Sequence, residues 1–206
     1  MFDFPGDETD MAKFFDSLQN TVLAGVGLVV VYVLITRGIA MDHNWFAFLF
    51  RWLHVLSGVM WIGLLWYFNF VQIPSMPKIP DDQKPAVSKV IAPEALFWFR
   101  WAALSTLVTG LILALMNGYL GSALMLGIGS GVMKNTAIGI GMWLGIIMAF
   151  NVWMIIWPNQ QKALGLVEAD ADAKKQAAAT AKLFSRINTM LSVPMLFAMV
   201  GAQNIF

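Results

Sequence analysis

The sequence predicts an all-α integral membrane protein, a bundle of about five transmembrane helices. Of its 206 residues, 59% are hydrophobic and only 12% are charged, against about 25% charged in an ordinary soluble domain. Several apolar runs reach the roughly 20 residues that a helix needs to cross the hydrocarbon core of a bilayer. The lipid bilayer is therefore the first partner that we expect.

Residues 1–19 are expected to lie outside the membrane domain, which we place at residues 20–206. The opening "MFDFPGDETD" is acidic, whereas a secretory signal begins with basic residues. Hydrophobic residues then recur at i, i+3, i+4 and i+7, a spacing that predicts a short amphipathic helix lying on the membrane surface; they are Met11, Phe14, Phe15 and Leu18. A frayed tail is the alternative.

The apolar runs place the five spans at about residues 20–36, 45–70, 94–116, 138–157 and 183–206. A polar loop with four prolines separates the second span from the third. The charged, alanine-rich "EADADAKKQAAATAKLF" before the last span predicts a helix that projects from the membrane and continues into that span.

Prolines mark the ends and bends of the later spans. Pro93 suits the first turn of the third span. Pro158 is expected to end the fourth span, and Pro194 to kink the fifth. Residues 118–135, "GYLGSALMLGIGSGVMKN", are apolar but short and glycine-rich. They predict an interfacial or a re-entrant loop rather than a sixth span.

The placement of Lys and Arg predicts the orientation. One side of the membrane, which carries the N-terminus and the loops after spans two and four, holds nine basic residues: Lys13, Lys78, Lys84, Lys89, Lys162, Lys174, Lys175, Lys182 and Arg186. The other side holds Arg37 and Lys134, with Arg51 close to it. Because cytoplasmic loops are the basic ones, we expect a cytoplasmic N-terminus, a periplasmic C-terminus and a multi-pass protein of the bacterial inner membrane.

Polar side chains within the spans need a reason, because lipid offers them no hydrogen-bond partner. One set gathers at the predicted cytoplasmic ends of the helices and comprises Asn69, Arg100, Asn151, Asn159, Arg186 and Asn188, joined by Gln72, Glu94 and Gln160. Hydrogen bonds between helices and arginines that reach the lipid headgroups account for such residues. A ligand site is the alternative.

His54 and Arg51 lie in the other half of the second span, and Trp61 follows His54 on the same helix face. A neutral imidazole can ligate haem iron, and haem b is the cofactor that His54 would hold. His43 is eleven residues away on the same helix, about 16 Å, so a second axial ligand would have to be a methionine, such as one on span five, or a residue of another chain. The alternative is a histidine hydrogen-bonded to a backbone carbonyl of a neighbouring helix.

Composition excludes several kinds of site. With no cysteine, the chain has no disulfide, no c-type haem attachment and no cysteine-ligated iron–sulfur cluster. Only two histidines occur, both within one short stretch, so neither a Ser-His-Asp set nor a metal site is predicted, and no catalytic residue is assigned. A net charge of +1 gives no basic field for nucleic acid. Gly141-x-x-x-Gly145 indicates close helix packing.

Four stretches, in order, resemble the membrane domain of bacterial urate hydroxylase, the urate oxidase N-terminal family: "RWLHVLSGVMWIGLLWYFNFVQIP", "APEALFWFRWAAL", "MAFNVWMIIWPNQQKAL" and "SRINTMLSVPMLFAMV". The resemblance runs from about residue 45 onward and implies a membrane oxidoreductase whose full-length members pass electrons to a C-terminal cytochrome c domain. His54 matches the family's second-span histidine. Ile187 and the final "GAQNIF" stand where many members carry further histidines.

We therefore expect a short stand-alone relative that lacks the cytochrome domain. The first functional hypothesis is a non-catalytic membrane subunit, accessory to a larger oxidoreductase or energy-transducing complex and packed against its other membrane subunits. The chain alone is then not an enzyme. The alternatives are an electron-transfer protein that binds haem b at His54, and a membrane carrier for urate or a related purine at the Asn/Arg set.

Overall fold

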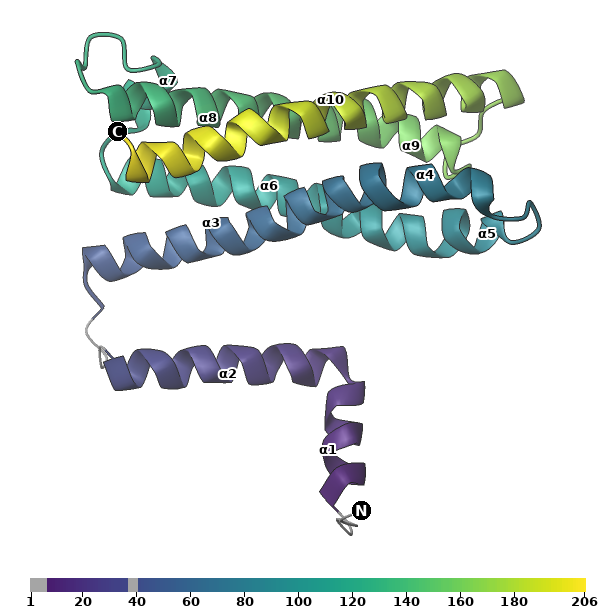
Figure 1. Cartoon of the computed structure of the whole chain (residues 1–206), viewed down its shortest axis with the longest axis horizontal. Helices are drawn as coiled ribbons and strands as arrows, with labels where there is room; N and C mark the ends of the chain where they lie inside the picture. The colour runs from purple at the N-terminus through teal and green to yellow at the C-terminus, as the bar shows by residue number, and fades with distance from the viewer. Residues whose placement is uncertain (1–6, 37–40) are drawn as a thin grey trace. The chain divides into compact units, whose positions relative to one another are not determined.

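The computed structural model describes residues 7–36 and 41–206, in which every regular element is a helix (Figure 1). Five stretches are long and apolar enough to cross a membrane, which confirms the predicted fold class: Leu18–Thr36, His43–Lys78, Lys84–Met116, Met133–Ala163 and Ala171–Asn204. The chain divides into two compact units, Met1–Phe46 and Ala47–Phe206.

The first unit contains α1 (Asp7–Asp16) and α2 (Leu18–Thr36). The amide of Asn20 donates a 3.3 Å hydrogen bond to the carbonyl oxygen of Phe14, so the start of α2 is tied back to the end of α1. The first six residues of the predicted acidic tail and Arg37, used above for the orientation, lie outside the described residues. The apolar sequence of α2 has no charged residue.

The second unit is built from four long helical rods that run alongside one another (Figure 1). Asp42 precedes the first rod and accepts a 2.8 Å hydrogen bond from the backbone N–H of Trp45, a typical N-terminal cap. Asp170 caps the last rod in the same way through Ala173. In chain order, the segments are α3 (His43–Trp66), η1 (Tyr67–Gln72), α4 (Ile73–Ser75), η2 (Met76–Lys78), α5 (Lys84–Ala86), η3 (Val87–Ile91), α6 (Ala92–Met116), α7 (Leu120–Leu124), α8 (Met133–Phe150), η4 (Asn151–Ile156), α9 (Trp157–Ala163) and α10 (Ala171–Asn204).

Three of the rods contain a π-helical segment, and each of these segments ends two residues before a proline. The segments η1, η3 and η4 are followed by Pro74, Pro93 and Pro158. A proline ring clashes with the carbonyl four residues earlier, and here that carbonyl lies in the π-helical turn, where the hydrogen bonds reach one residue further. The rods therefore continue through these prolines. The helix that contains Pro158 runs on to Ala163, so the prediction that this proline ends the fourth span is wrong.

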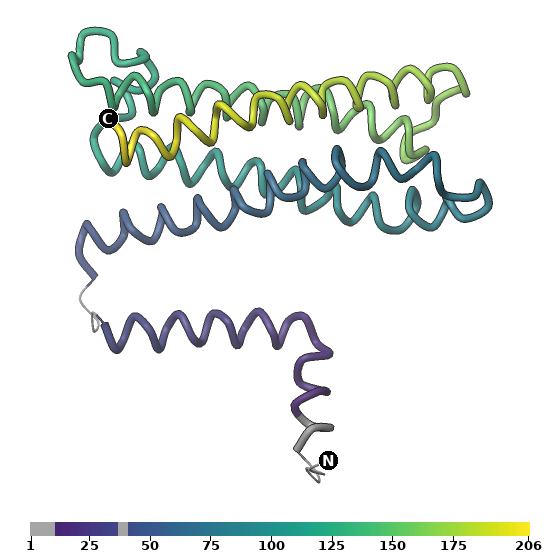
Figure 2. Tube along the Cα trace, viewed as in Figure 1, coloured from purple at the N-terminus to yellow at the C-terminus, as the bar shows by residue number. Residues whose placement is uncertain are grey.

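The last rod is one unbroken helix. The alanine-rich stretch that was expected to project from the membrane and the fifth span form a single element, α10, which includes Pro194. This helix lies along α8 over much of its length (Figure 2).

The main core lies between the four rods. Its most buried large side chains are Trp61, Leu65, Phe99, Met148 and Ile156, each no more than 2% exposed. Each rod except the last supplies at least one of them, and α10 adds Met195. This apolar centre fixes the register in which the rods present their few polar groups to one another.

A second, smaller cluster closes one end of the bundle. Ala123 of α7, Ile138 of α8 and Ala202 near the C-terminus pack together there. Gly139 is buried in the same place, and a Cβ added to it would clash with the carbonyl oxygen of Ala123. Residues 118–135, for which an interfacial or re-entrant loop was predicted, comprise α7, a turn-rich connection and the start of α8.

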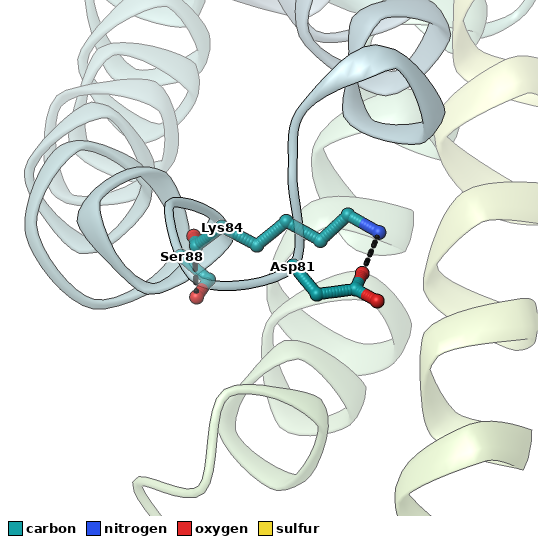
Figure 3. Close-up of polar contacts among 3 residues, drawn as sticks. All are labelled: Asp81, Lys84 and Ser88. Atoms are coloured by element: carbon teal, nitrogen blue, oxygen red, sulfur yellow. Dashed lines mark hydrogen bonds and ion pairs between the residues drawn. The ribbon is translucent and has the colours of Figure 1, made fainter.

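At the opposite end, the loop between the first two rods of the second unit carries a short polar network (Figure 3). The ammonium of Lys84 lies 2.6 Å from a carboxylate oxygen of Asp81, and the hydroxyl of Ser88 donates to the carbonyl of Lys84 at 3.1 Å. Lys84 stabilises the ionised form of Asp81 and so lowers the pKa of that carboxyl group.

Candidate functional site

The central pair of polar residues joins α8 and α10. The side-chain amide of Asn151 donates a 2.8 Å hydrogen bond to Oδ1 of Asn188, and the amide of Asn188 donates at 2.9 Å to the backbone carbonyl of Met148. Asn188 is completely buried and Asn151 is 6% exposed. Both residues lie near the middle of their helical rods, and the π-helical segment η4 begins at Asn151.

Two further bonds attach the first rod to α10. The amide of Asn69 donates to Oγ of Ser185 at 2.7 Å, and the indole N–H of Trp66 donates to Oγ of Ser192 at 3.0 Å. Ser192 in turn donates to the carbonyl of Thr189. The sequence indicated Asn69 but not these partners, because serines and tryptophans are common in membrane helices and nothing local distinguishes the ones that face each other.

The arginines of the predicted set lie apart from this network. The guanidinium of Arg100 stacks on the ring of Trp157, 3.8 Å from its centroid, a favourable cation–π geometry. The backbone carbonyl of Arg100 accepts a 3.1 Å bond from the indole of Trp153. Arg186 is exposed, and Asn159 donates to the carbonyl of Ile155 in its own helix. The structure therefore joins Asn69 and Asn151 to α10, the helix that carries Asn188. Arg100, Arg186 and Asn159 of the predicted set lie apart from these contacts.

His54 is held between α3 and α6. Its Nδ1 lies 2.8 Å from the carbonyl oxygen of Thr106. A carbonyl can only accept, so Nδ1 carries the proton and Nε2 is left as an acceptor or ligand atom. Gly110 makes room for the ring, because a Cβ added there would come within 2.7 Å of Cε1 of His54.

A cavity of about 630 Å³ lies beside His54, between α3, α6, α8 and α10. Its walls are mainly apolar, and methionines from two rods, Met142, Met195 and Met199, contribute to them. The polar residues that line it besides His54 include Arg51, Tyr119, Gln203 and Asn204. Such a volume falls within the range of roughly 300–1,000 Å³ that is usual for small-molecule and cofactor sites.

Trp61 lines the same cavity two turns beyond His54. It is 2% exposed, and its Nε1 is buried with no hydrogen-bond partner among the described residues. A buried indole N–H normally has a partner, so this group is the unexplained polar atom of the site. From the sequence, Trp61 shared a helix face with His54 but had no role. Burial without a partner, which only the structure reveals, is what singles it out.

Other groupings contribute little chemistry. Among the side chains of residues 11–36 and 41–206, no three from His, Asp or Glu come close enough to hold a metal ion. Burial raises the pKa of the Tyr119 phenol, and the nearby positive charge of Arg51 opposes that shift. Of the predicted Gly141-x-x-x-Gly145 pair, Gly141 packs against Met199 of α10, whereas Gly145 faces open space in the cavity.

A comparison with known protein families matches residues 132–204 to the urate oxidase N-terminal family. The matched region covers α8, η4, α9 and all of α10, and thus contains the Asn151–Asn188 pair. No curated protein and no solved structure matches the chain. The resemblance predicted from the sequence is confirmed over this region, which is similar to the urate oxidase N-terminal family.

Proposed function

We propose that this protein is a non-catalytic membrane subunit, accessory to a larger oxidoreductase or energy-transducing complex of the bacterial inner membrane. The observation that carries the proposal is the use made of the polar residues within the bundle. Asn69, Asn151 and Asn188 direct their amide N–H groups to Ser185, to one another and to the backbone of Met148. N–H groups engaged in this way hold helices together.

The outward face of α10 gives such a subunit a surface for its neighbours. Met190, Val193 and Phe197 lie on one face of this helix and are each more than 60% exposed. Lipid covers such a face in an isolated bundle, and another membrane helix covers it within a complex. The family relation supports an oxidoreductase as the complex, because urate hydroxylase is a membrane oxidoreductase.

The test is purification of the tagged full-length chain from its own membranes in a mild detergent, with quantification of every co-purifying protein. We expect membrane subunits of one oxidoreductase in fixed molar ratio. A photo-crosslinking residue at Phe197 should link the chain to one of them, whereas the same residue at Leu65, which is fully buried, should give no link. Recovery of the chain only by itself, with no crosslink from Phe197, would contradict the proposal.

A second candidate function is electron transfer through haem b held by His54. The observation that favours it is the position of Met195 and Met199, which line the same cavity as His54 and supply thioether sulfurs from α10. His54 would use Nε2 as an axial ligand while the Thr106 carbonyl holds Nδ1. When bound, haem b exchanges single electrons with a partner.

A reduced-minus-oxidised absorption spectrum of the purified protein tests this candidate. A haem b signal that is present in the native chain and in His43→Ala, and absent from His54→Ala, would support it. A spectrum without haem from a folded preparation would contradict it.

A further inference from the structure

The cavity beside His54 is polar at one end and mainly apolar along the rest of its length. Its polar end is formed by Arg51, Tyr119 and Gln203. They come from the first half of α3, the residues after α6 and the last turn of α10, which lie at the same end of the bundle (Figure 1). The charge of Arg51 is near enough to Tyr119 to oppose the rise in the pKa of its phenol. From there the cavity follows α3 as far as Trp66, fifteen residues from Arg51 and so about 22 Å along the helix axis.

The polar end carries donors that the protein itself does not use. Among the described residues, Arg51 forms no ion pair, and neither Tyr119 nor Gln203 donates a side-chain hydrogen bond. Asp42 precedes α3 but is engaged as the cap of that helix. The acidic side chains of the second unit all lie in the opposite half of the bundle and are Asp81, Asp82, Glu94, Glu168, Asp170 and Asp172. A guanidinium, a phenol and an amide without partners form a site for an anion.

Farther along the cavity, most polar atoms are engaged within the protein. Nδ1 of His54 and Oγ1 of Thr106 both donate to backbone carbonyls of α6. Nε1 of Trp66 donates to Ser192 of α10, and Nε1 of Trp61 is itself enclosed by the protein. A hydrocarbon chain fits this part of the cavity, because it has no polar group to leave unpaired there.

These features select a molecule with a negative head and a long hydrocarbon chain. A free phosphate ion would leave the apolar length empty, and an uncharged hydrocarbon would leave Arg51 without a partner. A zwitterionic headgroup brings an ammonium as well as a phosphate, and no acidic side chain of the second unit lies at this end to receive it. One leaflet is about half of a bilayer core of roughly 30 Å, so a cavity about 22 Å long has room for one acyl chain.

We propose that the cavity binds an anionic phospholipid, with its phosphate at Arg51 and one acyl chain along α3 toward Trp66. The guanidinium and the other donors of the polar end donate to the phosphate oxygens. The second chain lies outside, against exposed valines that line the edge of the cavity. These are Val55, Val59 and Val200, each more than half exposed. This site goes beyond the accessory role proposed above and does not depend on it, and it takes the space that haem would need.

Two variants separate the headgroup from the chain. Arg51→Gln removes the charge of an exposed side chain that forms no ion pair. Its control is Lys134→Gln, which removes a positive charge at the start of α8, at the same end of the bundle, from a residue that does not line the cavity.

Gly145→Leu fills the apolar part of the cavity, because a Cβ on Gly145 meets no atom within 4 Å and the residue lines the cavity wall. Gly121→Leu is the matched control, since Gly121 also has open space around it and does not line the cavity. Neither Arg51 nor Gly145 belongs to the apolar core, so both variants should fold.

The full-length chain is purified in mild detergent, and the phospholipid and haem that it retains are quantified after solvent extraction. Protein exchanged into lipid-free detergent is then mixed with equal amounts of phosphatidylglycerol and phosphatidylethanolamine with identical acyl chains, and native mass spectrometry counts the bound lipids. We expect about one tightly held lipid per native chain, with phosphatidylglycerol preferred by about fivefold or more. Arg51→Gln should lose this preference and Lys134→Gln should keep it. Gly145→Leu should lose the tightly held lipid whichever headgroup it carries, and Gly121→Leu should retain it.

Several results would overturn the proposal. A preference for phosphatidylglycerol that is the same in Arg51→Gln as in the native chain places the headgroup elsewhere. Lipid retained equally by the native chain and Gly145→Leu shows that no acyl chain enters the cavity. Haem in equal molar amount with the native chain assigns the cavity to the haem candidate. A native chain that retains no lipid leaves the site without its ligand.

Discussion

Asn151 and Asn188 form a direct amide–amide hydrogen bond of 2.8 Å at the centre of the α8–α10 interface. The bond is extended by the 2.9 Å contact from Asn188 to the carbonyl of Met148. The side-chain amide N–H groups of Asn151 and Asn188 and Oδ1 of Asn188 are thereby engaged in a region that is buried from water. A hydrogen bond between membrane helices contributes about 1 kcal/mol or less on average, so the larger effect comes from breaking the pair on one side only.

Asn188→Leu should destabilise the bundle more than the loss of one average hydrogen bond. The substitution leaves the amide of Asn151 buried without its partner, and such a group costs about 1–3 kcal/mol. Unfolding of the solubilised protein, followed by circular dichroism, measures the change. Asn117→Ala is the control, because the amide of Asn117 donates to Leu113 in its own helix. The double variant Asn151→Leu/Asn188→Leu should cost less than the two single changes added together.

Gly139→Ala should displace α7 from α8. The new Cβ would clash with the carbonyl oxygen of Ala123, a backbone atom that cannot move without the helix that carries it. Overpacking of this kind costs roughly 1–3 kcal/mol. Gly145→Ala adds the same methyl group to the same helix in open space and should leave stability nearly unchanged. Equal unfolding transitions for the two variants would show that α7 does not pack against Gly139.

The membrane fold was predictable because the lengths of the apolar runs in the sequence indicate it directly. A run of apolar residues long enough to cross a bilayer is rare in soluble proteins, so α2 and the four rods of the second unit were expected from hydropathy alone. The termini of the rods were less predictable. Pro158 was expected to end a helix because proline usually does so. The π-helical turn that accommodates it is formed by six residues with no recognisable sequence signature, so it could not be predicted.

The polar site was predictable in part. Asn69, Asn151 and Asn188 were indicated because amides are costly in lipid. Their partners were not, since Ser185 lies 116 residues from Asn69 and only the packing of the rods brings them together. The indole N–H groups of Trp66 and Trp153 also join helices, and nothing in the local sequence distinguishes these tryptophans from the others.

The titration of Asp81 should depend on Lys84. The 2.6 Å contact lowers the pKa of the carboxyl group in the folded protein, so whatever stability this pair adds is present above the ordinary pKa of aspartate and is lost as the pH falls through the lowered value. In Lys84→Met the pKa of Asp81 should rise toward the ordinary value of an aspartate side chain. Carbon NMR of the labelled carboxyl group measures it, with Lys89→Met as the control. An unchanged pKa would show that the contact does not form in solution.

His54 should be found in the Nδ1–H form. The carbonyl of Thr106 accepts from Nδ1 at 2.8 Å, and this contact favours one tautomer because a carbonyl offers no proton in return. Nitrogen NMR of the imidazole distinguishes the two ring nitrogens, and His43→Gln assigns the signals because the chain has only two histidines.

Gly110→Ala places a Cβ within 2.7 Å of the His54 ring and should break the contact with Thr106, so that both tautomers appear. Gly63→Ala, where an added Cβ meets no atom within 4 Å, should leave the spectrum as it is. If Nε2 instead carries the proton in the native chain, it has no free lone pair, and the haem candidate loses its ligand atom at His54.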